Sequence, residues 1–316
     1  MNSKKVNWLF LSIILVEFGI VGLIIVLNGY FRVGFTLSIA ENLILSEMIL
    51  FMPALIFVMA SLKGRGAQGL NDMLGFHKIK ISSFFMVILF TVLIMPMTTA
   101  INAISMIFVD NAVTAISGDV LGMPFPIMLF LMGIYGPFCE EFVFRGVIYR
   151  GYKNSGAVFW SIFWSSLLFG LMHLNFNQAA YAIAIGIMFA LLVEATGSLW
   201  SSAIAHMFFN SEQVCTMYLV NHFMPETYSG NNVNNTLTTD ALLAAIGPYL
   251  IIAVVATSLA VCVLVWIAKN EGRENVLRNI WILRKRKGTY LVSVPLLIAI
   301  VLCLAYMSLN VILGMI

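Results

Sequence analysis

The chain has 316 residues, of which 61% are hydrophobic and only 10% are charged, and its formal net charge is +3. Because soluble domains carry roughly 25% charged residues, this composition excludes a soluble globular protein of this length. Apolar runs of about 20 residues, long enough to cross the hydrocarbon layer of a bilayer, recur along nearly the whole chain. Four cysteines lie in separate apolar stretches without a C-x-x-C pair, which predicts buried free thiols and no disulfide framework or zinc knuckle.

The sequence predicts an all-α, polytopic transmembrane bundle of eight or nine spans that forms a single membrane domain, 1–316. The first run, from Val6 to about Asn28, is too long for a signal-peptide core and has no small-residue cleavage site, so we expect an uncleaved span. We find no internal repeat. The nine candidate spans are 7–28, 42–62, 83–108, 126–150, 157–175, 178–195, 199–222, 242–268 and 289–314.

The basic residues predict the orientation of this bundle. With a cytoplasmic N-terminus and nine alternating spans, every lysine and arginine except Arg32 lies on or toward the cytoplasmic side. The opposite orientation would invert the positive-inside rule. This orientation predicts that the basic run 284–287 is a cytoplasmic anchor beside lipid headgroups. We expect no nucleic-acid partner. The Asn-rich segment 228–239 is expected to be an outer loop.

Ionisable groups inside the spans are candidates for function, because each costs about 2.5–3.5 kcal/mol to insert. Span four contains Glu140, Glu141 and Arg145 after Pro137, which predicts a helix break near 136 and a new helix whose first turn holds both glutamates. Glu141 and Arg145 are four residues apart and can form an ion pair. Glu140 points about 100° away from this pair, so its carboxylate stays available for another role.

Two further spans carry histidines. Span five ends at Phe169 and His173, and span seven holds His206 and Asn210 on one helical face. His206 and Asn210 suit either an oxyanion clamp or a metal site. The alternation of spans places His173 near the outer face and His206 nearer the cytoplasm, so tilt, a short span five or the break at Pro137 would be needed to bring them together.

These groups together could hydrolyse a bond. Glu140 and His173 could deprotonate and hold a water, while His206 and Asn210 could stabilise the oxyanion. The chain has no H-E-x-x-H and no G-x-S-x-G motif. The other glutamates in the predicted spans have no comparable group of ionisable residues near them in the sequence: Glu17, Glu41, Glu47 and Glu194.

The motifs E-E-x-x-x-R, F-x-x-x-H and H-x-x-x-N, in this order on separate spans, resemble the CPBP family, which includes CAAX prenyl proteases of type II and bacteriocin-processing enzymes. The resemblance covers 118–225, which would be the catalytic core, and leaves 242–316 as C-terminal spans of unassigned role. It implies an intramembrane glutamic endopeptidase in which Glu140 and His173 activate water, His206 and Asn210 form the oxyanion hole, and Glu141 and Arg145 hold the site together.

The substrate would be a membrane-associated peptide or lipidated protein at the bilayer. Two other classes of function stay open: a non-catalytic membrane scaffold or immunity protein, and a proton-coupled transporter. A zinc enzyme is a further alternative, with Glu140, His173 and His206 as ligands. We expect no cofactor, because Asn210 is a poor zinc ligand and the sequence shows no second acid at matching spacing to orient His206.

Overall fold

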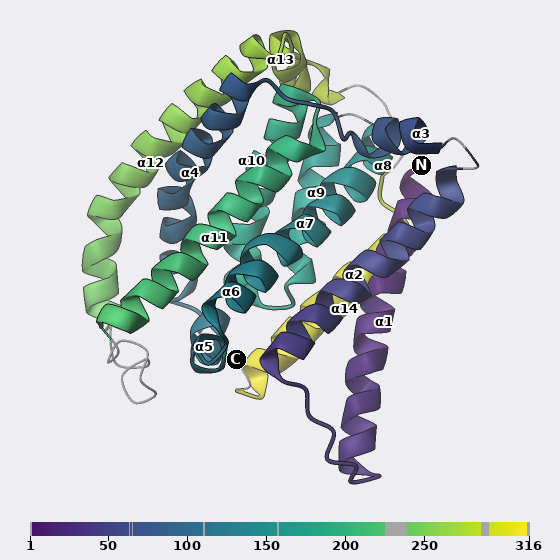
Figure 1. The fold of residues 1–316 in the computed structure, drawn as a ribbon, viewed down its shortest axis with the longest axis vertical. Helices are drawn as coiled ribbons and strands as arrows, with labels where there is room; N and C mark the ends of the chain where they lie inside the picture. The colour runs from purple at the N-terminus through teal and green to yellow at the C-terminus, as the bar shows by residue number, and fades with distance from the viewer. Residues whose placement is uncertain are drawn as a thin grey trace.

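A computed structural model of the chain describes residues 2–62, 64, 66–109, 111–156, 158–224, 239–285 and 291–314. Over these residues it is a bundle of helices without strands (Figure 1). The predicted outer loop lies outside this part of the chain, apart from residue 239. The main helices are α1 (Ser3–Gly29), α2 (Ile39–Leu62), α3 (Gly66–Leu74), α4 (Ile81–Ser105), α5 (Ala112–Leu121), α9 (Val158–Met172), α10 (Phe176–Thr196), α11 (Leu199–Phe223), α12 (Thr239–Asn270), α13 (Glu274–Ile282) and α14 (Val294–Ile312).

The predicted membrane bundle is confirmed, and each of the nine candidate spans corresponds to a helix. Seven helices are long and apolar enough to cross a membrane among the residues described. The other two are α9, which has only 15 residues, and α11, which has 25 residues but a more polar sequence. These two exceptions carry the histidine motifs.

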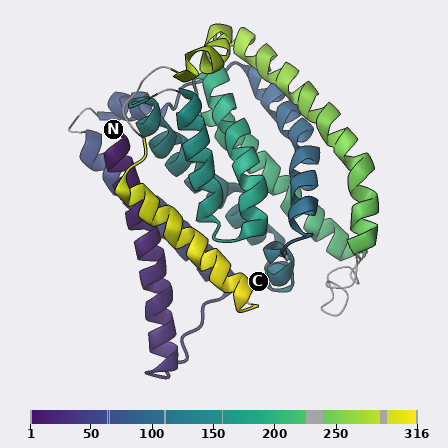
Figure 2. The same ribbon diagram turned by 180° about the vertical axis from the view of Figure 1, so that it is seen from behind.

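The two ends of the bundle differ in charge. Figures 1 and 2 show the N-terminus, α3, α8 (Arg150–Lys153) and α13 at one end, with α5 and the C-terminus at the other. Basic residues border the helices at the first end, including Lys5, Lys80, Lys153, Lys269 and Arg273. We call this the basic end.

Close helix packing surrounds the centre of the bundle. A Cβ added at Gly186 of α10 would lie 2.9 Å from Ser166 Cβ of α9, so the two helices approach closely. The last helix, α14, runs beside α1 (Figure 2). Asn7 of α1 donates to the Leu291 carbonyl at 2.8 Å and accepts from Tyr152 Oη at 2.6 Å. The additional C-terminal span is therefore tied to the same bundle as the motifs.

The expected helix break at Pro137 is wrong. Residues 125–153 form one continuous helix made of α6 (Phe125–Met128), η1 (Leu129–Tyr135), α7 (Gly136–Glu141), η2 (Phe142–Tyr149) and α8. Gly136 has helical dihedral angles, φ −57° and ψ −57°, so Glu140 and Glu141 lie in the helix interior and not in a first turn. The segments η1 and η2 are π-helical, a local geometry that is frequent at functional sites.

The neighbouring helix explains how the membrane tolerates Pro137. Proline has no N–H, so it cannot bond to a carbonyl of the preceding turn. Asn210 Nδ2 donates to the Met132 carbonyl at 3.2 Å, and Ser211 Oγ donates to the Gly133 carbonyl at 3.3 Å. These carbonyls lie five and four residues before the proline. Side chains of α11 therefore satisfy backbone groups in this turn, as is usual for proline in membrane helices.

Candidate active site

Four of the six predicted site residues line one cavity. Glu140 comes from α7, His173 follows the end of α9, and His206 and Asn210 come from α11. The cavity has a volume of about 280 Å³. Its other polar lining residues are uncharged: Thr98, Thr99, Asn102, Asn111, Gln178, Tyr181 and Gln213. The predicted site residues on three separate spans are thus brought to one place.

His206 lies between the two glutamates. Its Nδ1 is 3.0 Å from Glu141 Oε1, and its Nε2 is 3.5 Å from Glu140 Oε2. Since a carboxylate can only accept, Nδ1–H donates to Glu141, which fixes the orientation of the ring and leaves Nε2 toward the cavity. The expectation that no acid orients His206 is therefore wrong. The partner is a glutamate on another helix.

Glu141 and Arg145 form the buried rear wall of the site. Arg145 Nη1 donates to Glu141 Oε1 at 2.6 Å, and the two side chains are 1% and 0% exposed. The guanidinium also lies 4.3 Å from the ring centroid of Phe169 and 5.6 Å from that of Phe189. The predicted ion pair is present, and it holds His206 through a shared carboxylate oxygen. Glu140, with 19% of its side chain exposed, is the more accessible of the two glutamates.

His173 reaches the cavity because α9 is short. At about 1.5 Å per residue its 15 residues span roughly 22 Å, less than the hydrocarbon thickness of about 30 Å. The chain turns at Leu174, where φ is +52°, and α10 begins after the Asn175 cap. Of the three possibilities considered for bringing the histidines together, the short span is present. His173 Nδ1 bonds to the Phe169 carbonyl at 2.9 Å, which leaves Nε2 as the acceptor of the ring.

Two glutamates that the sequence left without partners have them in the structure. Glu47 of α2 packs against α7, since a Cβ on Gly136 would lie 3.1 Å from Glu47 Oε1. Glu194 of α10 is 1% exposed and forms an ion pair with Lys153. The only sequence signal for either residue was a carboxylate inside an apolar span, because the partners lie far away in the chain.

The alternative zinc set is not assembled in this geometry. Among the residues that the structure describes, no three His, Cys, Asp or Glu side chains are grouped closely enough to hold a metal ion. Within the candidate set, His206 Nε2 faces Glu140 while its Nδ1 is occupied by Glu141. The orientation of His206 does not itself exclude zinc, because zinc-ligating histidines are commonly held by a carboxylate in this way; what the described residues lack is a third donor close to the other two.

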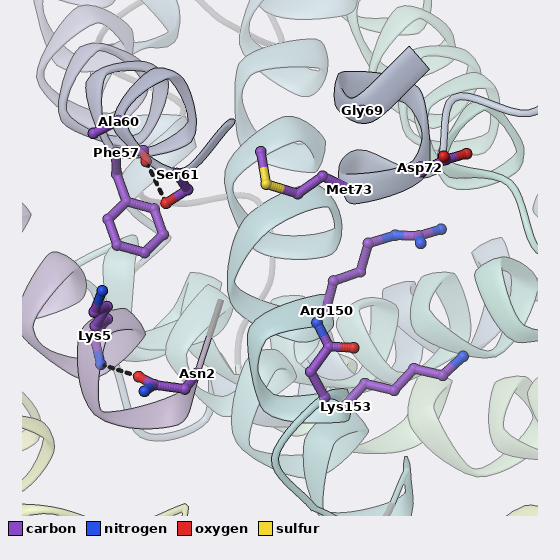
Figure 3. Close-up of a pocket in the computed structure, with 11 residues that line it drawn as sticks. Asn2, Lys5, Phe57, Ala60, Ser61, Gly69, Asp72, Met73, Arg150 and Lys153 are labelled. Carbon is purple, nitrogen blue, oxygen red and sulfur yellow. Dashed lines mark hydrogen bonds between the residues drawn. The ribbon is translucent and has the colours of Figure 1, made fainter. Parts of the chain in front are cut away.

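A second, larger cavity of about 800 Å³ lies at the basic end, between α1, α2, α3 and α8. Figure 3 shows Lys5 and Asn2 on one side, and Arg150 and Lys153 extending away from them. Arg150 donates to the Gly197 carbonyl at 3.3 Å, and Lys153 is paired with Glu194. No motif residue lines this cavity, so size alone does not identify the site.

Comparison with known proteins matches a segment that lies within the region covered by the motif resemblance, 118–225. Residues 122–211 match the family described as type II CAAX prenyl endopeptidase Rce1-like. A stretch of 86 residues, 27% of this chain, is 30% identical to the "Putative membrane peptidase YdiL" of Bacillus subtilis (strain 168) and covers 35% of it. The chain thus matches about a third of the length of this relative, and no solved structure matches it significantly. Residues 122–211, which carry the three complete motifs on helices of the membrane bundle, are thus similar to a family of membrane proteases.

Proposed function

We propose that the protein is an intramembrane endopeptidase that hydrolyses a peptide bond of a membrane-associated peptide with a water activated by Glu140 and His173. The observation that carries this proposal is the convergence of Glu140, His173, His206 and Asn210 in one polar cavity. Behind it, the buried Glu141–Arg145 pair fixes His206. A scaffold would have no need for a cavity lined by these groups.

The geometry supports a sequence of proton transfers. Glu140 accepts a proton from the water, and His173 Nε2 accepts a hydrogen bond from the same water. The water oxygen then bonds to the carbonyl carbon of the peptide, whose oxygen becomes an oxyanion. Asn210 donates one N–H of its amide to Met132 and keeps a second N–H for this oxyanion.

His206 serves the second half of the reaction. In the tautomer held by Glu141, its Nε2 donates only after taking up a proton, and Glu140 Oε2, 3.5 Å away, can deliver the one taken from water. The resulting imidazolium is stabilised by Glu141 and stabilises the oxyanion. When the C–N bond breaks, the proton on Nε2 passes to the leaving amine nitrogen, and the other product is the carboxylic acid.

We also propose that the reaction proceeds without a metal ion. Elemental analysis of active purified protein after chelation and dialysis tests this. Activity that persists below stoichiometric zinc supports the proposal. Activity that is lost with zinc and restored by its return would contradict it and move Glu140, His173 and His206 to a ligand role.

The peptidase itself is tested by comparing membrane peptides from cells that express the protein or its Glu140→Gln variant, using mass spectrometry. Removing a catalytic base typically costs about 10² to 10⁴ in rate, so cleaved products should disappear in the variant. Glu212→Gln is the matched control, because Glu212 lies on α11 outside the cavity and binds Gln213 and Thr216. A cellular function that survives Glu140→Gln unchanged would favour the scaffold.

A further inference from the structure

The catalytic cavity extends toward the end of the bundle opposite the basic end. Its polar lining comes from the last turns of α4, the connection to α5, the first turn of α10 and the second half of α11. These residues are Thr98, Thr99, Asn102, Asn111, Gln178 and Gln213. Gln213 is exposed, so the lining at this end reaches the surface.

Several side chains between the catalytic groups and the basic end are buried. Val143 and Val147 of η2, Phe189 of α10 and Ser202 of α11 are 0% exposed, and Leu199 at the start of α11 is 1% exposed. His206 lies seven residues from that end of α11, or about 10 Å at 1.5 Å per residue, while Gln213 lies about 21 Å from it. Along α11, His206 therefore lies nearer the basic end than Gln213 does, and the side chains of α11 on that side of it, Leu199 and Ser202, are buried.

The charges assign sides to these two ends. Short basic segments next to membrane spans stay in the cytoplasm. Lysines and arginines gather at the basic end, whereas the opposite end carries Glu41 and Asp119 and, among the residues described there, a single arginine, Arg32.

We infer that the catalytic cavity opens on the extracytoplasmic side and takes an extended peptide segment from that side, of a secreted or membrane-anchored protein. The nature of this substrate rests on the proposed peptidase function, but the side of opening does not. A cavity of about 280 Å³ is smaller than most drug-sized ligand cavities, roughly 300–1,000 Å³, so it holds only a short piece of a chain. Its uncharged polar wall suits a peptide backbone. An opening on this side favours a propeptide or leader over a prenylated cytoplasmic C-terminus.

The test is labelling of single cysteines by a membrane-impermeant maleimide, in a background in which Cys139, Cys215, Cys262 and Cys303 are replaced. Gln213→Cys reports on the cavity. Tyr30→Cys, at the exposed C-terminal end of α1, reports on the end opposite the basic end. Ser61→Cys, which lines the second cavity, reports on the basic end.

In intact cells, Gln213→Cys and Tyr30→Cys should react, and Ser61→Cys should react only after permeabilisation. Failure of Gln213→Cys to react while Tyr30→Cys does would overturn the opening, and reaction of Ser61→Cys in intact cells would overturn the orientation. The same labelling in a Glu140→Gln background keeps this result separate from peptidase activity. A reporter peptide supplied outside intact cells should be cleaved by the active protein only, and cleavage confined to a cytoplasmic copy would contradict the inferred substrate.

Discussion

The shared carboxylate of Glu141 predicts that the two adjacent glutamates respond differently to the same substitution. Glu141→Gln keeps the shape of the side chain but leaves Arg145, which is 1% exposed, without its counter-charge. Breaking one partner of a buried ion pair costs about 3–5 kcal/mol. The aromatic faces of Phe169 and Phe189 lie over the guanidinium before and after the substitution, so they do not change this difference. A loss of about 3–5 kcal/mol is therefore expected.

The assay is thermal unfolding in detergent, followed by the fluorescence of the six tryptophans. At roughly 2–4 °C per kcal/mol for a domain of 150–250 residues, Glu141→Gln should lower Tm by about 6–20 °C. Glu140→Gln should change Tm by less than about 2 °C, since 19% of its side chain is exposed and its contact is the longer one to His206. That variant should nevertheless lose peptidase activity.

A double substitution separates the ion pair from other effects of Glu141. Glu141→Gln with Arg145→Met removes both buried charges, and such replacements are often neutral or stabilising. The double variant should therefore recover much of the Tm lost in Glu141→Gln. Additive losses in the double variant would refute the ion-pair argument. Full activity in Glu140→Gln, with activity lost and Tm unchanged in Glu141→Gln, would show that the two roles are reversed.

Three other substitutions probe the surroundings of the site. Gly133→Val should lower Tm, at a cost of about 1–3 kcal/mol, because a Cβ there would lie 2.6 Å from Ser211 Oγ and 3.2 Å from Ser211 Cα; an unchanged Tm would show that α11 can move away. Glu194→Gln should cost only about 1 kcal/mol, measured in the same melt, since its lysine partner is 35% exposed and can reach water; a loss as large as that of Glu141→Gln would contradict this. Glu47→Leu should raise Tm, because Glu47 Oε2 is buried without a hydrogen-bond partner and leucine fills similar space without a buried polar atom; a lower Tm would indicate a further stabilising contact of the carboxyl group.

Much of the fold could be predicted from the sequence, because the bilayer imposes helices of defined length and apolar composition. Of the nine predicted spans, seven correspond to helices of the described residues that are long and apolar enough to cross a membrane, and the other two correspond to α9 and α11. Apolar runs alone could not show whether the helix continues through Pro137. Proline removes a backbone donor from the helix, and here Asn210 and Ser211 of another span bond to carbonyls of the preceding turn. The two π-helical segments likewise leave no signal in the periodicity of an almost wholly apolar run.

The candidate site was predictable as a set of residues but not as a set of contacts. Spacing within one helix gave the Glu141–Arg145 pair correctly. The bond between His206 and Glu141 joins residues 65 positions apart, and no local pattern encodes it. Glu47 and Glu194 were misjudged for the same reason, since their neighbours come from other helices.

The F-x-x-x-H motif has a physical reason in this arrangement. Four residues before His173, the Phe169 carbonyl accepts from Nδ1 and so sets the tautomer that presents Nε2 to the cavity. The Phe169 ring lies 5.1 Å from His173, 5.8 Å from His206 and 4.3 Å from the guanidinium of Arg145. A smaller residue would keep the backbone contact but leave space between the buried charge and the two imidazoles. Because this one ring contacts both histidines and the rear ion pair, the groups that carry out the chemistry and the groups that hold the helices together form a single packed unit.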